Sequence, residues 1–180
     1  MDINIRGKTK SMCKAEIKFA TAFFARYVMG ERLASNIDFD IVFENQGKMA
    51  EGHCFPLDSD RKPRMFEIGV NPNLRRYKML QCIAHEIVHA KQYARGELFH
   101  EMITAKWKGK TYKVTNSFED YLNWPWEIEA YGRDRSLYLF YTIMLKSEKI
   151  SFKNGHLLIR GKRATKKMLT SSKNAANIYT

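Results

Sequence analysis

The chain has 180 residues, of which 44% are hydrophobic, and a formal charge of +12. This length can bury one substantial core, so we expect a single domain. The three cysteines are far apart and form no CxxC pair, so neither a cysteine-rich zinc knuckle nor a disulfide framework is indicated. Because no apolar run has the length of a signal peptide or a membrane span, we expect a soluble, intracellular protein with no membrane partner.

The positive charge is concentrated near the C-terminus. Residues 146–180 contain nine Lys or Arg residues against one acid, Glu148, for a net charge of +8. The stretch 160–180 also lacks periodic hydrophobicity, so we expect a folded domain over 1–159 and a basic, flexible tail over 160–180. Such a tail suits nonspecific contact with nucleic-acid phosphates, and it equally suits a solvated segment that favours solubility.

The first half of the chain predicts one helix and two strands. Apolar residues recur at helical spacing within 11–34, which indicates an amphipathic helix. Residues 37–44 alternate between apolar and mostly polar side chains, the pattern of a strand with one buried face. A loop containing Gly52 and Pro56 is expected next, and a second strand over 64–70 follows it.

The second half predicts two longer helices. One spans about 76–95 and the other 125–147, where a proline stands at the first helical position. Between them, 107–114 is typical of a short hairpin or loop-strand segment. Asn154-Gly155 separates two apolar runs and predicts a type I′ hairpin. Together these elements predict the α+β class, with a small, mostly antiparallel sheet.

The helix over 76–95 contains the motif H-E-x-x-H at His85, Glu86 and His89. Four-residue spacing puts the two imidazoles on one face of a helix, one turn apart, where both can bind the same Zn²⁺ ion. Glu86 lies beside that face, where a carboxylate can take a proton from a zinc-bound water and pass it to a leaving amine. The flanking residues are apolar, so these polar groups would be costly to bury without a metal or hydrogen bonds.

A catalytic zinc needs a third protein ligand, and the helix over 125–147 offers Glu127 and Glu129. Glu127 shares a face with Ala130, whose small side chain would let two helices approach, and with Asp134. Glu129 points nearly the opposite way and would be the ligand if the metal lay on that side. Both carboxylates could instead be ordinary residues of a helix N-terminus. His100 is the remaining alternative.

Three segments, HEIVHAKQYARGEL, WKGKTY and PWEIEAYG, resemble the small SprT-like or gluzincin metallopeptidases that are often found in phage genomes. The resemblance covers about residues 64–140. It implies a zincin-like minimal metalloprotease domain, with an N-terminal helix, an active-site helix and a second ligand-bearing helix. The pattern E-x-E-A of related gluzincins implies Glu127 as the ligand, whereas a SprT-like third histidine would be His100. Tyr131 replaces the usual Asp or Asn, so Asp134 or Tyr131 is expected to brace a ligand histidine.

The expected function is therefore zinc-dependent hydrolysis of peptide bonds, with a protein or peptide as substrate. In zincins the substrate lies extended along a sheet edge, for which the strand over 64–70 is the expected partner. A tyrosine, Tyr93, Tyr112, Tyr121 or Tyr131, could donate to the oxyanion, and His53 could reach the cleft.

Two other functions remain open. The chain could be a non-proteolytic DNA-binding or host-interaction protein with a structural zinc, or a zinc hydrolase of a non-peptide amide. The resemblance to SprT-like proteases implies substrates that are associated with nucleic acid, and a phage-encoded protein would act in the host cytoplasm. The oligomeric state is left open.

Overall fold

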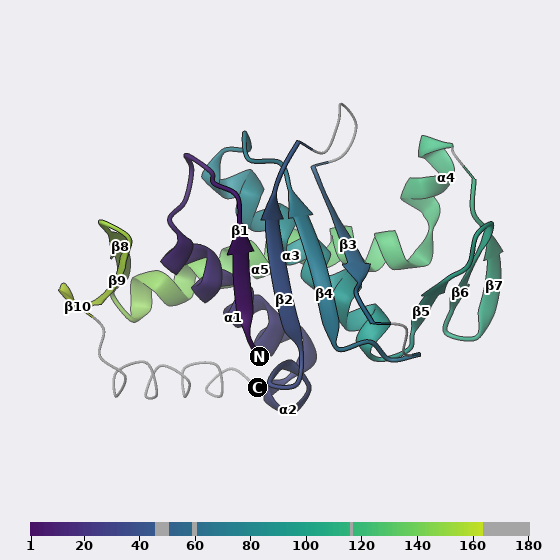
Figure 1. The fold of residues 1–180 in the computed structure, drawn as a ribbon, viewed down its shortest axis with the longest axis horizontal. Helices are drawn as coiled ribbons and strands as arrows, with labels where there is room; N and C mark the ends of the chain where they lie inside the picture. The colour runs from purple at the N-terminus through teal and green to yellow at the C-terminus, as the bar shows by residue number, and fades with distance from the viewer. Residues whose placement is uncertain (46–50, 59–60, 116, 164–180) are drawn as a thin grey trace.

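The computed structural model describes residues 1–45, 51–58, 61–115 and 117–163. Within these residues the chain forms five helices and three small sheets, an α+β structure (Figure 1). The helices are α1 (Lys14–Met29), α2 (Glu31–Ala34), α3 (Arg76–Ala94), α4 (Phe118–Asn123) and α5 (Pro125–Ser147). The strands are β1 (Ile3–Arg6), β2 (Asp38–Phe43), β3 (Gly52–Pro56), β4 (Met65–Val70), β5 (Leu98–His100), β6 (Thr104–Trp107), β7 (Lys110–Lys113), β8 (Ile150–Lys153), β9 (His156–Ile159) and β10 (Lys162–Arg163).

The central sheet has the strand order β1-β2-β4-β3. The β1–β2 and β2–β4 pairings are parallel, and only the β3–β4 pairing is antiparallel. The prediction of a mostly antiparallel sheet is therefore wrong for the central sheet. The helical connection from β1 through α1 to β2 brings those two strands side by side in the same direction, as in a crossover unit. The two smaller sheets, β5-β6-β7 and β10-β9-β8, are antiparallel.

Helices α1, α3 and α5 all lie behind the central sheet in Figure 1. The strands bury alternate side chains against these helices, which is the period-two pattern of a half-buried sheet. The side chains that form this buried face include Ile3, Ile5, Phe39, Ile41, Phe66 and Ile68. The opposite face is polar, and on it Arg6 pairs with Asp40 at 2.7 Å and with Glu67 at 2.6 Å. Because α3 packs against the sheet on one side and α5 on the other, it is the most enclosed helix.

Strand β3 occupies the segment that was predicted to be a loop. Gly52 and Pro56 favoured a loop, but both fit the edge of a sheet. A Cβ at Gly52 would lie 2.5 Å from Sγ of Cys82 and 2.7 Å from the carbonyl oxygen of Gly69, so the glycine lets β3 approach α3. Pro56 pairs with Phe66 at the end of the edge strand, where its missing N–H is tolerated. The prediction of β4 as the edge is also wrong, since β4 lies between β2 and β3.

The other predicted elements are close to those observed. The helix over 11–34 is interrupted at Gly30, whose φ of 81° ends α1 and precedes the short α2. The turn between β8 and β9 is confirmed at Asn154-Gly155, where both residues have positive φ, as a type I′ turn requires. Strand β10, inside the predicted tail, pairs with β9, and residues 164–180 of that tail lie outside the described residues.

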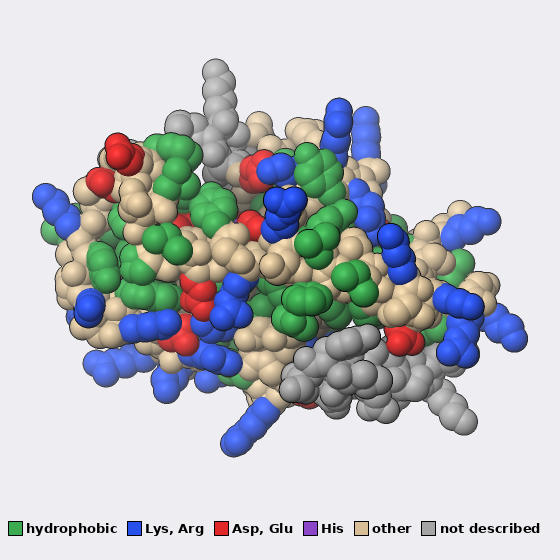
Figure 2. Space-filling model, turned by 180° about the vertical axis from the view of Figure 1, so that it is seen from behind, with side chains coloured by type: hydrophobic (Ala, Val, Ile, Leu, Met, Phe, Trp, Pro, Cys, Tyr) green, Lys and Arg blue, Asp and Glu red, His purple; other side chains and the backbone are tan. Residues whose placement is uncertain are grey.

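Lys and Arg side chains are spread over the face behind the sheet, with hydrophobic side chains between them (Figure 2). The exposed hydrophobic residues of α5 include Leu139, Phe140 and Ile143. Among the helices that the structure describes, none combines the length and apolar character that crossing a membrane requires.

Candidate metal centre

Two helices bring His85, His89 and Glu127 together. His85 and His89 lie one turn apart on α3, as the H-E-x-x-H spacing predicts. Glu127 lies in the first turn of α5, which begins at Pro125 because Trp124 before it has the extended conformation that a following proline favours. Ala130, which is fully buried, lies one turn after Glu127, on the predicted face where α3 and α5 pack together.

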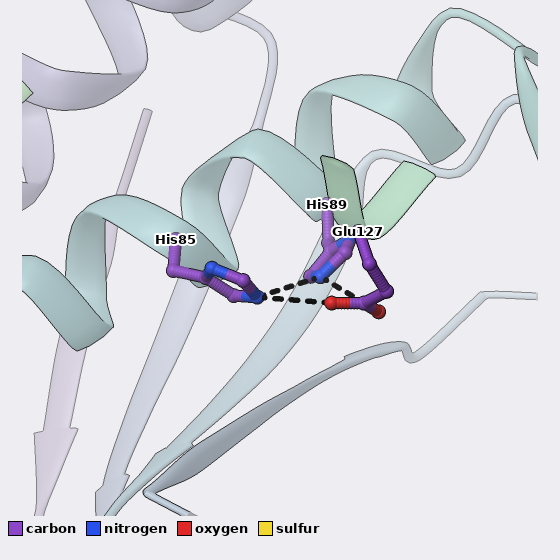
Figure 3. Close-up of side chains that lie close together, drawn as sticks. All are labelled: His85, His89 and Glu127. Atoms are coloured by element: carbon purple, nitrogen blue, oxygen red, sulfur yellow. Dashed lines mark hydrogen bonds and ion pairs between the residues drawn. The ribbon is translucent and has the colours of Figure 1, made fainter. Parts of the chain in front are cut away.

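The donor atoms of these three residues converge on one point (Figure 3). Nε2 of His85 lies 3.1 Å from Nε2 of His89 and 3.3 Å from Oε2 of Glu127. Nε2 of His89 lies 3.4 Å from Oε1 of Glu127. All three side chains are buried, and the chosen donor atoms lie within 4.8 Å of one another, so the group could hold a metal ion.

Charge in the group is balanced by protons when no metal is bound. Burial lowers the pKa of His85, but contacts with Asp134 and Glu127 outweigh it and raise the pKa to about 10. Burial raises the pKa of Glu127, but contacts with His85 and His89 outweigh it and lower the pKa to about 2. In the metal-free group at neutral pH, His85 is therefore a positively charged imidazolium and Glu127 a negatively charged carboxylate.

One atom of the group lacks a suitable hydrogen bond. Oε2 of Glu127 is buried and accepts no well-aligned hydrogen bond from any residue that the structure describes. A buried carboxylate oxygen without a hydrogen bond is costly, and a cation at this position would compensate it. This atom faces Nε2 of His85, so the need for a cation arises where the three donors meet.

Glu86 is buried beside the group, next to the edge strand β3. Its Oε1 lies 3.2 Å from the position that a Cβ would take at Gly52. Burial raises the pKa of Glu86, and nearby Glu127 raises it further, while His89 and His85 lower it. Its carboxylate is thus placed beside the donors rather than among them, as the motif predicts.

The two alternative third ligands lie elsewhere. Glu129 accepts a hydrogen bond from Lys91 at 2.9 Å and another from Gln92 at 3.1 Å. Burial raises the pKa of Glu129, but these two contacts lower it overall, so it remains a carboxylate. His100 packs its ring against Trp126, with 5.7 Å between centroids, and against Tyr93 at 6.1 Å. Neither residue belongs to the convergent group found among the described residues.

Asp134 and Tyr131 both contact His85, as one of them was expected to do. Oδ2 of Asp134 lies 3.7 Å from Nδ1 of His85, and the ring of Tyr131 meets the His85 ring edge-on at 4.6 Å. Of the four tyrosines considered for the oxyanion, Tyr93, Tyr121 and Tyr131 have a raised pKa, to which the charge of Glu127 contributes after the larger effect of burial. Tyr112 packs on Trp126 instead.

Sequence reasoning missed Gln92 and Lys91. Gln92 is fully buried and its Oε1 lies 2.8 Å from Nδ1 of His89. Lys91 is only 4% exposed and contacts Glu97 at 2.6 Å as well as Glu129. The available indication was that two polar residues follow His89 and Ala90, next to a mostly apolar part of the helix.

His53, which was expected in a loop, lies on β3, and its ring covers Gly69. His53 is close to Glu67 on the polar face of the sheet, with 3.6 Å between Nε2 and Oε1.

Comparisons of the chain with family models, with curated proteins and with solved structures gave no match. Conclusions about function therefore depend on the residues themselves.

Proposed function

We propose that the chain is a zinc-dependent peptidase of the zincin type. The observation that carries the proposal is the spacing of the three buried donors. Donors held about 2.0–2.1 Å from a tetrahedral Zn²⁺ ion lie about 3.3 Å from one another. The contacts between His85, His89 and Glu127 are 3.1, 3.3 and 3.4 Å. Two imidazoles and one carboxylate are also the donor set of many catalytic zinc sites.

Glu86 supports a hydrolytic rather than a purely structural role. A zinc ion in this group would polarise a substrate carbonyl and make a water molecule more acidic. Glu86 would accept the proton of the attacking water and deliver it to the leaving amine. A carboxylate whose pKa is raised by burial is suited to both transfers, because it holds a proton more readily than an exposed one.

Strand β3 supports a peptide as the substrate. Leu57 N–H donates to Met65 and Asn71 N–H to Glu51, so the odd-numbered residues of β3 share hydrogen bonds with β4. The backbone groups of Gly52 and Cys54 therefore point away from β4, along the outer edge of the sheet. No described strand pairs with that edge. An extended peptide could add there, next to Glu86.

Metal content is the first test. Wild-type protein loaded with zinc and then desalted is expected to retain about one zinc per chain by plasma mass spectrometry. Glu127→Ala is expected to lose it, whereas the matched variant His100→Ala is expected to retain it. Glu129→Ala is expected to keep at least part of the zinc, because Glu129 lies outside the group of donors. Zinc that survives in Glu127→Ala and is lost completely in Glu129→Ala or His100→Ala would reject the ligand set.

Peptidase activity is the second test, measured with a library of quenched fluorescent peptides. Glu86→Gln is expected to bind zinc normally and to lose at least about 100-fold in kcat. A fully active Glu86→Gln protein would reject the mechanism. Zinc bound by His85, His89 and Glu127 without cleavage of any peptide would favour a structural zinc or a non-peptide amide as substrate.

A further inference from the structure

Gln92 connects the metal-binding group to the interface between α3 and α5. Its side chain makes three contacts and has no exposed surface. Nε2 donates to the backbone carbonyl of Trp126 at 2.9 Å and to Oε2 of Glu129 at 3.1 Å, and Oε1 lies 2.8 Å from Nδ1 of His89. The NH₂ group of the amide therefore contacts α5, and its oxygen contacts His89.

These contacts determine which way the amide points. A backbone carbonyl can only accept a hydrogen bond, so the end of Gln92 that faces Trp126 must be the NH₂ group. The other end is then the carbonyl oxygen, which can only accept. Nδ1 of His89 must therefore carry a proton, and in the neutral ring Nε2 then presents a lone pair toward His85.

We propose that Gln92 is a positioning residue that fixes the tautomer and ring orientation of His89, and that Glu129 holds Gln92 in place. The proposal deepens the proposed zinc site and rests on it. A metal-binding histidine usually donates its second N–H to an acceptor, which orients the ring and strengthens its donor nitrogen. In this chain that acceptor is the neutral amide of Gln92. It adds no negative charge to a buried site that already contains the carboxylates of Glu86 and Glu127.

Glu129 acts through Gln92 rather than by binding the metal. Its Oε1 is paired with the buried Nζ of Lys91 at 2.9 Å, and this fixes Oε2 toward Gln92. Lys91 also contacts Glu97, so the ammonium group has two carboxylate partners. Only one of them, Glu129, contacts the side chain of Gln92.

Gln92→Met tests the proposal, because methionine is similar in size and its thioether is only a weak acceptor for the hydrogen bond from His89. The two ring nitrogens of His89 would be followed by long-range ¹H–¹⁵N spectra in mildly alkaline solution, first metal-free and then with zinc. The wild type is expected to show a protonated Nδ1 in both states. The variant is expected to show a mixture of tautomers when metal-free and a zinc Kd raised about 10–100-fold.

Glu129→Ala and Glu97→Ala form a matched pair, since each removes one carboxylate partner of Lys91. Glu129→Ala is expected to weaken zinc binding to a level between wild type and Gln92→Met, and Glu97→Ala is expected to bind zinc like the wild type. This pair keeps the proposal testable if Gln92→Met does not fold. Equal effects of the two alanine variants would overturn the role of Glu129.

Support for the role of Gln92 requires both changes in Gln92→Met. A raised Kd with unchanged His89 nitrogens would assign the loss to packing and overturn the proposal, and so would a change in tautomer without a change in Kd. If wild-type protein binds no zinc, the proposed function fails. The metal-free spectra would still decide whether Gln92 fixes the His89 tautomer.

Discussion

At the scale of single residues, the contacts of His85, His89 and Glu127 indicate which ring nitrogens carry a proton when no metal is bound. The two Nε2 atoms are 3.1 Å apart, a distance at which two lone pairs would repel unless a proton or a cation lies between them. Since Nδ1 of His89 carries the proton donated to Gln92, the shared proton belongs to His85. This agrees with the pKa of His85, which is raised to about 10.

Zinc binding should therefore displace a proton. Zinc requires a neutral imidazole, and His85, with a pKa of about 10, is protonated in the metal-free protein at neutral pH. Apparent zinc affinity is expected to rise by about tenfold per pH unit while His85 remains protonated, and to fall as pH decreases. Calorimetry in two buffers of different ionisation enthalpy should detect release of about one proton per zinc near pH 7. Binding without proton release would contradict the assignment.

At the scale of elements, two glycines show how local surroundings decide the effect of one change. Gly132 lies in the interior of α5, is exposed, and has no atom within 4 Å of the position that a Cβ would take. Gly52 lies on β3 against α3, where the same Cβ would be 2.5 Å from Sγ of Cys82. The helix has room for a methyl group, and the interface between strand and helix has none.

Substitution by alanine is expected to change the free energy of unfolding in opposite directions at these two positions. Gly132→Ala should stabilise the protein by about 0.5–1 kcal/mol, because alanine loses less backbone entropy in a helix. Gly52→Ala should destabilise it by about 1–3 kcal/mol, because β3 or α3 must shift. Urea unfolding of the metal-free proteins gives both free energies of unfolding. Changes of the same sign would contradict the difference in space around these two glycines.

At the scale of the whole molecule, α3 connects the parts of the domain. It packs on the central sheet, on α1 and on α5. Helix α5 contributes Glu127, so a metal held with His85 and His89 would link α5 to α3 and, through α3, to the sheet. The metal would then belong to the folded state and would be lost on unfolding.

Zinc should accordingly stabilise the whole fold. At a free zinc concentration of 100 times the Kd, binding contributes about 2.7 kcal/mol to the free energy of unfolding. For a chain of this length, that corresponds to a rise in Tm of roughly 5–10 °C. Differential scanning calorimetry with zinc and with a chelator measures the shift. Glu127→Ala should show no rise, and an equal rise in that variant would mean that zinc stabilises the fold at another site.

The sequence by itself determined the features that depend on neighbours along the chain. The four-residue spacing of His85 and His89 places them on one helical face wherever the helix lies. The proline before Trp126 set the start of α5, and Asn154-Gly155 set the turn of the β8–β9 hairpin. The pattern E-x-E-A at 127–130 favoured Glu127, which the structure brings to both histidines. The zincin assignment and the basic tail as a nucleic-acid contact remain predictions.

Only the tertiary structure decided the features that depend on distant segments. It placed β3, which had been predicted as a loop, at the sheet edge beside Glu86, and it made two of the three central pairings parallel. It also separated Glu127 from Glu129. Glu127 lies beside the two histidines of α3, whereas Glu129 pairs with Lys91 of the same helix. Local periodicity fixes which face of an element is buried, whereas the partner of that face depends on how the elements pack.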